Sequence, residues 1–291
     1  MKIDTLKRIE EDFLTFLSVE KNLSKNTLES YKRDLEKFFQ FLLLKKLSYR
    51  YVRGRNLVEF MIFLKKKGLS SSSIARTLSC IRCLYRYLIS KGNAYPTILN
   101  FFESPKIERK IPEIINKQDI NKIMLADTTK REKTRIRNMV ILGLLATTGL
   151  RVSELAAVKK EDVNIDENWI RVTGKGNRER IVFFPEEIKV LLAHYLSHDG
   201  KFLFESRRGK PITRQNIWKI VRLSGKKAMV GRYLKPHMFR HTFATELLES
   251  GMDIRIIQEL LGHKSISTTK IYTQVSKTRL KNIYKKFHPR A

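Results

Sequence analysis

Apolar residues recur at three- and four-residue intervals along most of this chain, and that period restricts its fold more than any other feature. Leu6 and Ile9 already show the spacing that places side chains on one face of an α-helix. One region departs from the period: the runs 169–173 and 180–184 are rich in β-branched and aromatic residues, and the glycine-rich segment 174–179 joins them. The sequence therefore predicts a mainly α fold with one small antiparallel β-sheet.

A segment bracketed by two prolines divides the chain. Residues 105–112 begin at Pro105, end at Pro112, are basic and have no apolar period, which is typical of a linker. At 291 residues the chain is long enough for two domains of ordinary size. We expect an N-terminal helical domain over 1–104 and a C-terminal, mainly helical domain over 113–291 that carries the sheet.

The charge of the chain is strongly one-sided. Fifty-nine Lys and Arg against 29 Asp and Glu give a formal net charge of +30 and a pI near 10.2. Such an excess indicates a polyanionic partner, either nucleic acid or an anionic membrane surface. The longest apolar run, 139–146, is far shorter than the roughly 20 residues that span a bilayer, and residues 1–7 contain no apolar signal region. We therefore expect a cytoplasmic nucleic-acid-binding protein with no membrane partner.

A basic helix face is the first candidate for contact with nucleic acid. The helix expected after Ser70 carries Arg76, Arg82 and Arg86 away from its apolar stripe. We expect this face to lie along phosphates, and a solvated surface is the alternative.

The same helix holds both cysteines, Cys80 and Cys83. Their C-x-x-C spacing occurs in redox and zinc sites, but there is no βαβ context and no second pair of ligands. We expect small helix residues that face a core, and no metal site.

Two patterns in the middle of the chain place a cation beside a glycine. An apolar helix ends at Gly149, and Arg151 opens the next helix, although a surface arginine after a cap would look the same. Lys175 stands between two glycines in the hairpin connection, where an ordinary solvated lysine is the alternative.

Two further patterns follow the hairpin. His237 lies in the first turn of a helix that begins with a proline, and Arg240 is on the same face three residues later. Backbone N–H groups at such a helix start favour anions. His263 follows a glycine that ends another helix, and Tyr272 comes nine residues after it. Taken alone, Tyr272 would more often be a packing residue.

The order of these residues is more specific than any one of them: Arg151, Lys175, His237-x-x-Arg240, Gly262-His263 and Tyr272. It resembles the tyrosine recombinase (phage integrase) family, and most closely its Xer-type members. Residues 23–35 (Leu-Ser-x-x-Thr-x-x-x-Tyr-x-x-Asp-Leu) and 73–79 are similar to the helical core-binding domain of that family. The match covers nearly the whole chain and implies a core-binding domain followed by a catalytic domain.

The resemblance implies that Arg151 and Arg240 clamp the scissile phosphate and that Glu154 is a supporting carboxylate that orients the site. Two guanidiniums suit this role because attack on a phosphodiester builds negative charge on the non-bridging oxygens.

The resemblance also implies a nucleophile, Tyr272, and a general acid for the leaving 5′ oxygen, Lys175. His237 and His263 would assist proton transfer and hold the phosphate oxygens. A tyrosine with a pKa near 10 is a poor nucleophile at neutral pH, so it needs cationic surroundings or a base. The covalent ester keeps the energy of the broken bond, so rejoining would need no ATP. The two guanidiniums would neutralise the charge that metal ions neutralise elsewhere, and the resemblance implies a reaction without metal or other cofactor.

The implied partner is double-stranded DNA, bound by a homotetramer, or a heterotetramer with a related recombinase, on two DNA sites. A DNA translocase is a possible activator, and the implied role is resolution of chromosome dimers at the nucleoid. A phage, transposon or integron integrase and a topoisomerase-like enzyme would have the same residues. A non-catalytic DNA-binding protein is a further alternative, but binding alone does not require the full set.

The end of the chain carries an apolar stripe formed by Leu280, Ile283, Tyr284 and Phe287, which predicts a short amphipathic helix. Such a helix must bury its stripe, either against its own domain or, as the resemblance implies, on a neighbouring subunit.

Overall fold

The structure is a computed structural model that divides into two compact units, Met1–Lys110 and Ile111–Ala291. The expected linker 105–112 lies outside the residues that the structure describes. Within the described residues, no helix is long and apolar enough to span a membrane. The structure describes residues 3–21, 23–102, 113–126, 129–174, 179–196, 200–206, 209–262 and 274–288. In the last of these ranges it describes side chains only from residue 280 onward.

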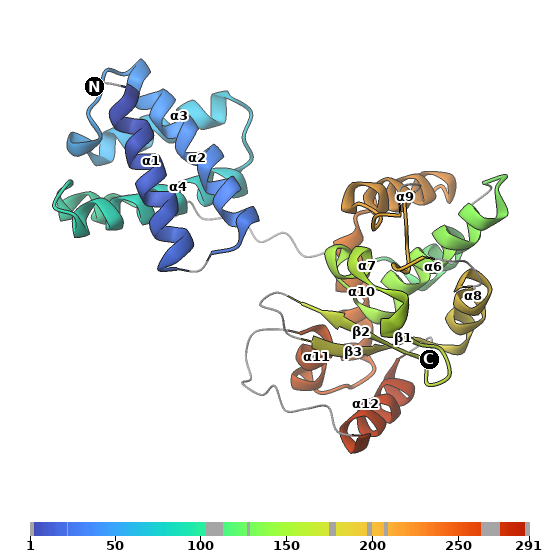
Figure 1. The fold of residues 1–291 in the computed structure, drawn as a ribbon. Coiled ribbons are helices and arrows are strands. Elements are labelled where there is room, and N and C mark those ends of the chain that lie inside the picture. Colours follow the sequence, from blue (N-terminus) through green and yellow to red (C-terminus); the bar gives the residue numbers. More distant parts are fainter. Residues whose placement is uncertain are drawn as a thin grey trace. The chain divides into compact units, whose positions relative to one another are not determined.

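The helices of the N-terminal unit pack together (Figure 1). They enclose one core that is rich in aromatic residues. Phe38 and Phe60 are fully buried, with their ring centroids 5.1 Å apart in an edge-to-face arrangement that aromatic pairs favour. The buried Tyr85 hydroxyl donates a hydrogen bond to the Tyr49 carbonyl at 2.8 Å. The elements are α1 (Ile3–Val19), α2 (Lys25–Leu44), η1 (Tyr49–Tyr51), α3 (Gly54–Lys66), α4 (Ser71–Ser90) and η2 (Pro96–Phe101).

Local sequence signals set the helix starts of this unit. α2 begins directly after Ser24 and α4 directly after Ser70, whose hydroxyl accepts a hydrogen bond from the Ser73 N–H. On α4, Cys80 is fully buried and Cys83 is half-buried, both as free thiols. The expectation that they are core-facing helix residues is confirmed.

The C-terminal unit contains the predicted sheet, in the order β1-β2-β3 with antiparallel pairs (Figure 1). Ile170 lies opposite Val182, and both are buried against the helices. The two-residue strand β1 was not predicted. The elements are α5 (Lys117–Leu125), α6 (Glu132–Thr148), α7 (Val152–Ala157), η3 (Lys160–Asp162), β1 (Val163–Asn164), β2 (Trp169–Thr173), β3 (Glu179–Phe183), α8 (Glu186–Leu196), α9 (Arg214–Lys227), α10 (Pro236–Glu249), α11 (Ile254–Leu261) and α12 (Gln274–Phe287).

α6 is the central helix of this unit, and its second half is apolar on every side, as expected for a helix that is covered all round. Val140, Leu142 and Leu145 have no exposed surface. The helix ends at Gly149, which adopts the left-handed conformation with φ of 62°. A Cβ at Gly149 would lie 2.5 Å from a ring carbon of Phe243, so the chain needs glycine at this helix end.

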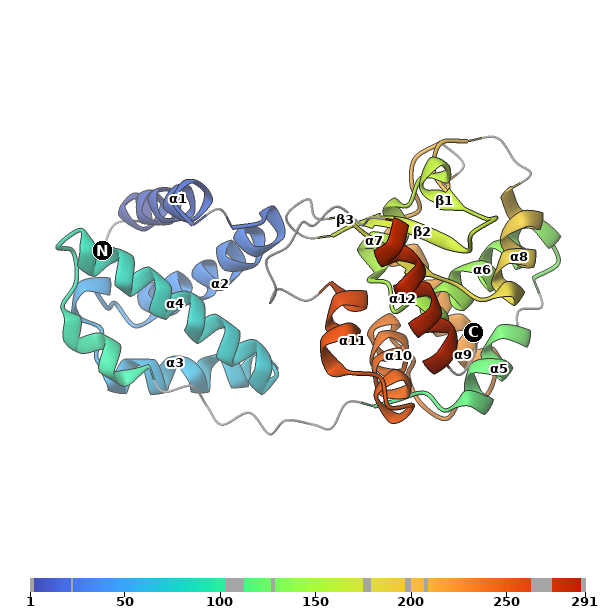
Figure 2. The same ribbon diagram turned by 90° about the horizontal axis from the view of Figure 1, so that it is seen from below.

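α12 packs against its own unit, on β3, α10 and α11 (Figure 2). Leu280 and Tyr284 are buried, and the Tyr284 ring lies 6.1 Å from that of Phe183. The Tyr284 hydroxyl donates to the Thr147 carbonyl of α6 at 3.0 Å. Of the two options for the terminal stripe, the structure therefore has the stripe covered by its own chain.

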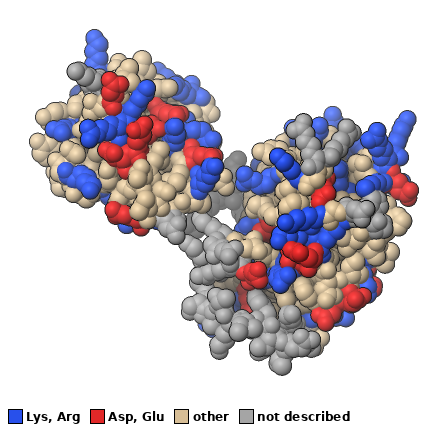
Figure 3. Space-filling model, in the orientation of Figure 1, with Lys and Arg blue, Asp and Glu red and all other residues tan. Residues whose placement is uncertain are grey.

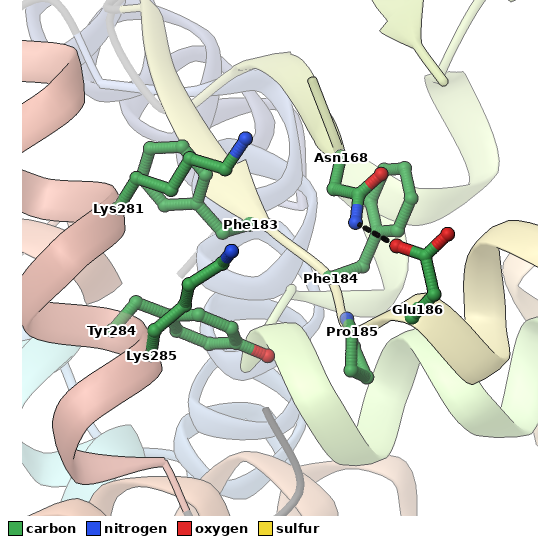
Figure 4. Close-up of a pocket in the computed structure, with 8 residues that line it drawn as sticks. All are labelled: Asn168, Phe183, Phe184, Pro185, Glu186, Lys281, Tyr284 and Lys285. Atoms are coloured by element: carbon green, nitrogen blue, oxygen red, sulfur yellow. Dashed lines mark hydrogen bonds between the residues drawn. The ribbon is translucent and has the colours of Figure 1, made fainter. Parts of the chain in front are cut away.

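A small cavity of about 230 Å³ lies between α12 and the end of β3 (Figure 4). The Asn168 amide group donates to Glu186 Oε2 at 2.9 Å on its far side. α12 therefore covers this side of the unit but leaves a cavity between itself and the end of β3. The lining residues are Asn168, Phe183, Phe184, Pro185, Glu186, Lys281, Tyr284 and Lys285.

Candidate active site

Arg151 stands where α6 gives way to α7, as the sequence predicts. The residue caps α7: its backbone N–H donates to Glu154 Oε2 at 2.8 Å, and its Nη1 donates to Glu154 Oε1 at 2.8 Å. Both hydrogen bonds run from Arg151 to the Glu154 carboxylate, and the first gives a partner to a backbone N–H that has none within the helix. The Arg151 side chain remains 35% exposed, so the guanidinium is oriented from below and accessible from solvent.

Glu154 lies beneath Arg151 with only 3% of its side chain exposed. Arg180 of β3 binds it with two parallel hydrogen bonds, from Nη1 at 2.9 Å and from Nη2 at 2.8 Å. Burial alone would raise the pKa of Glu154, but the hydrogen bonds and charge of Arg180, together with those from Arg151, lower it to about 2. Glu154 is therefore a carboxylate held between two arginines.

Arg240 projects from α10 toward the ends of two other helices. Its Nη1 donates to the Gly149 carbonyl at 2.6 Å and its Nη2 donates to the Leu261 carbonyl at 2.7 Å. These carbonyls belong to the C-terminal ends of α6 and α11, where backbone acceptors lack helical partners and the helix dipole favours cations. Burial, and then the nearby charges of Arg151 and Arg180, lower the pKa of Arg240 to about 10, still far above neutrality.

His237 lies in the first turn of α10 after Pro236, as predicted. Burial lowers its pKa, and the charges of Arg240, His241 and Arg151 lower it further, in that order. The imidazole is therefore biased toward its neutral form while no anion is bound. In that form it can accept or donate a proton.

Three of the predicted site residues, Lys175, His263 and Tyr272, lie outside the described residues. The described chain reaches Gly174 before the first of them and Gly262 before the second. Gly262 ends α11 with φ of 66°, in agreement with the predicted helix end.

Arg180 was missed by the sequence analysis, which treated it only as part of a β-type run. It is 5% exposed, and its Nε donates to the Leu260 carbonyl of α11 at 3.0 Å. One signal was present: Arg180 alternates with the apolar residues Val182 and Phe184, so the strand pattern directs a charge toward the core. A charge at such a position needs a buried partner.

The described part of the site is a cluster of arginines suited to an anion. The charges of Arg151 and Arg180 both lower the pKa of Arg240, and the carboxylate of Glu154 acts in the opposite direction. Guanidiniums with fixed orientation can bind two oxygens of a phosphate at once. Among the described residues, no group of His, Cys, Asp and Glu is arranged to hold a metal ion.

In the N-terminal unit the three arginines of the basic face differ in their surroundings. Arg76 binds the fully buried Asp34, with Nε at 3.0 Å from Oδ2 and Nη2 at 3.1 Å from Oδ1. Arg82 and Arg86 are exposed. The ion pair fixes the orientation of Arg76, whose side chain is still 51% exposed. All three arginines therefore remain candidates for contact with phosphates.

Two family models match the chain. "Phage integrase, N-terminal SAM-like domain" matches residues 11–92, and "Phage integrase family" matches residues 113–279. The chain is 38% identical to the tyrosine recombinase XerD of Staphylococcus haemolyticus, over 98% of this chain and 100% of that protein. It is also 38% identical to the tyrosine recombinase XerD of Listeria innocua, over 97% of this chain and 98% of that protein.

Solved structures with the same fold include the XerH site-specific recombinase bound to its difH substrate in a pre-cleavage complex. The two chains are 25% identical with a TM-score of 0.68, over 94% of this chain and 83% of that one. A lambda integrase dimer bound to a core site has a TM-score of 0.72 at 17% identity, over 93% of this chain and 100% of that one. At that identity the likeness shows the fold alone.

Proposed function

This chain belongs to the phage integrase family, the tyrosine recombinases, with Xer-type enzymes among its relatives, and from that premise we propose that its C-terminal unit joins DNA covalently to Tyr272. The protein is a site-specific DNA recombinase. What we propose is the assignment of residues, which rests above all on Arg151 and Arg240. Both are held from behind by protein acceptors.

Arg151 and Arg240 would bind the non-bridging oxygens of the scissile phosphate. The Gly149 and Leu261 carbonyls each take up one N–H of Arg240. A guanidinium has five N–H donors, so the same fork can also bind a ligand. Because the guanidiniums are positioned before DNA binds, they stabilise the developing charge without reorganisation. Loss of either would slow cleavage by about 10²–10³-fold, as for removal of an oxyanion donor.

The remaining assignments concern proton transfer. The Tyr272 hydroxyl oxygen would attack phosphorus, form a 3′-phosphotyrosine and break the bond to the 5′ oxygen. Lys175 would supply the proton that the leaving oxygen needs, and His237 with His263 would take up the proton of the tyrosine. The reverse attack by a 5′ hydroxyl would rejoin the strand, because the ester conserves the energy of the original bond.

We further propose the division of labour between the two units. Residues 1–104 would be a core-binding domain that contacts DNA, and 113–291 would be the catalytic domain. Arg76, Arg82 and Arg86 would contact phosphates, and the ion pair with Asp34 would orient Arg76 for that contact. The solved XerH relative is bound to a DNA substrate, which supports double-stranded DNA as the partner.

The assembly and biological role stay proposals that rest on the resemblance. We propose a multimer on DNA, in the form of a homotetramer or a heterotetramer on two sites, which resolves chromosome dimers and responds to a DNA translocase. α12 is packed on its own chain in the structure. Its docking on a neighbouring subunit remains a prediction for the DNA-bound assembly.

Covalent trapping tests the proposed chemistry. A suicide DNA substrate that carries a nick near the cleavage position, incubated with the protein in excess EDTA, should give a protein–DNA adduct that survives denaturant. The adduct should end in a 3′ phosphate on Tyr272, as identified by mass spectrometry of the linked peptide.

The matched control is Tyr272→Phe, which removes one oxygen and should give no adduct while DNA binding persists. An adduct that forms only with Mg²⁺, or that persists in the Phe variant, would show that the nucleophile or the mechanism is a different one.

A further inference from the structure

We propose that Arg180 is a positioning residue for DNA strand cleavage, which sets both phosphate-binding arginines through one buried network. The proposal rests on the proposed function, since it concerns the geometry of Arg151 and Arg240. Arg180 would not touch the DNA. It would act through Glu154 on one side and through the end of α11 on the other.

The first arm of the network runs to Arg151. Arg180 binds both oxygens of Glu154, and each of the same two oxygens also accepts a hydrogen bond from Arg151. Arg180 of β3 thus fixes the carboxylate from one side, and the carboxylate binds Arg151 at the start of α7 on the other side. A shift of Glu154 would move the Arg151 guanidinium with it.

The second arm runs to Arg240. Arg180 Nε donates to the Leu260 carbonyl at 3.0 Å, and Arg240 Nη2 donates to the next carbonyl, that of Leu261, at 2.7 Å. Two arginines from different elements therefore hold consecutive carbonyls at the C-terminal end of α11. In the sequence, a third proposed site residue, His263, comes two positions after Leu261.

The backbone around α11 is adapted to this contact. Gly262 is left-handed with φ of 66°, and a Cβ there would lie 3.2 Å from Cδ and from Nη1 of Arg180. The arginine therefore packs directly against the helix end as well as bonding to it. The network joins β3, α7 and α11, and Lys175 precedes Arg180 by five positions on the connection that leads into β3.

Stability alone does not account for a buried ion pair. The free energy needed to remove two charges from water cancels most of the free energy that their attraction contributes. Well-packed apolar residues often stabilise a core as well or better. What a bidentate Arg–carboxylate pair provides in addition is fixed geometry. That distinction makes the proposal testable, because a positioning residue affects the cleavage step more than binding.

The variant Arg180→Met tests it, with Arg180→Lys as the conservative change. Arg232→Met is the matched control, since Arg232 pairs with Asp119 at 3.4 Å in the same unit, outside the site. The measurements are the single-turnover rate of covalent cleavage across pH and the affinity for a half-site DNA. Arg180→Met should cleave about 10²-fold more slowly, with half-site affinity nearly unchanged, and Arg232→Met should match the parent.

The pH profile separates positioning from simple support of the fold. The charged groups that face Glu154 are Arg151, Arg180 and, farther away, Arg240, all cations. Without Arg180, burial should raise the pKa of Glu154, so that the carboxyl group gains a proton as pH falls and releases Arg151. The cleavage rate of Arg180→Met should therefore fall on the acid side at a higher pH than that of the parent.

Arg180→Lys keeps the charge but cannot bind two carboxylate oxygens and the Leu260 carbonyl with one ammonium group. It should remain folded and still cleave slowly. Parent-like rates and pH profiles in the Lys variant, or in a folded Met variant, would overturn the inference while leaving the proposed function intact. Absence of any adduct with the parent protein would instead overturn the proposed function, and this inference with it.

Discussion

A carboxylate that is almost completely buried keeps its charge only when cations replace the water it has lost. Glu154 satisfies that condition through Arg180 and Arg151, and its pKa of about 2 lies below its ordinary value of 4.5. The folded state therefore binds its proton more weakly than the unfolded chain does. The stability that this difference contributes is present above pH 4.5 and is lost as pH falls toward 2.

We expect this effect to appear as acid sensitivity of the C-terminal unit. The difference between 4.5 and about 2 corresponds to at most about 3 kcal/mol of unfolding free energy. Both tryptophans, Trp169 and Trp218, lie in this unit, so their fluorescence in urea reports its unfolding. The parent should lose stability between pH 5 and pH 2.5 more steeply than Glu154→Gln, which has no proton to gain. Equal slopes would mean that Glu154 is not the titrating group.

Lys175 is expected to protonate the leaving 5′ oxygen, and a sulfur substrate isolates that task. Lys175→Ala should cleave normal DNA more slowly by about 10²–10⁴-fold, the usual contribution of a general acid. A substrate with a 5′-bridging phosphorothiolate should restore the rate, because sulfur leaves without a proton. Arg151→Ala is the control, since a phosphate-binding group should show no selective rescue. Lack of rescue in Lys175→Ala would mean that Lys175 only binds the DNA and does not protonate the leaving oxygen.

The sequence was sufficient for residues whose placement is local. Arg151 and His237 were predicted at helix starts because a capping glycine and a helix-opening proline lie next to them. Arg180 was missed because its partners, Glu154 and Leu260, are 26 and 80 positions away, and no local period encodes such a contact. The position of Lys175 relative to the phosphate-binding arginines likewise stays a prediction.

The helices and strands lie within a few residues of the ranges that their sequence patterns predict. The patterns did not predict which elements pack against one another. The paired runs that predicted β2 and β3 were long enough to show β-type composition, but the two residues of β1 carry no such signal. The stripe on α12 predicted a buried face without indicating what covers it. Burial of a stripe depends on the partner surface, which in this structure is β3 with α10 and α11.

The contact between α12 and α6 depends on one hydroxyl group, that of Tyr284. The Thr147 carbonyl lies in the last turn of α6, where helical acceptors lack partners, and the Arg151 N–H that follows is engaged by Glu154. Tyr284→Phe should therefore leave a buried acceptor unsatisfied and lower the unfolding free energy of the unit by about 1–3 kcal/mol. Urea unfolding followed by tryptophan fluorescence measures it, with Tyr233→Phe, at an exposed tyrosine, as the control. An unchanged free energy would show that α12 does not hold α6.

The net charge of +30 is distributed over both units. On the face drawn in Figure 3, Lys and Arg side chains lie on each unit with acidic side chains among them. Like charges at this density repel one another in the isolated protein, and DNA phosphates would remove that repulsion. Binding should therefore be governed by counterion release, which gives a quantity that can be measured without knowledge of the DNA site.

DNA affinity should fall steeply with salt concentration, with a log–log slope of about −0.9 for each phosphate that a cation neutralises. Arg82→Ala combined with Arg86→Ala should make the slope shallower by about two, because both exposed side chains are expected to contact phosphates. The charge-matched control is Arg55→Ala with Lys65→Ala on α3, which removes two exposed cations from another helix of the same unit. Fluorescence anisotropy of a labelled duplex at several salt concentrations gives the three slopes.

If both double variants change the slope equally, the charge acts diffusely and α4 is not the contact face. A nearly flat dependence in the parent would mean that the excess of Lys and Arg serves something other than binding to DNA.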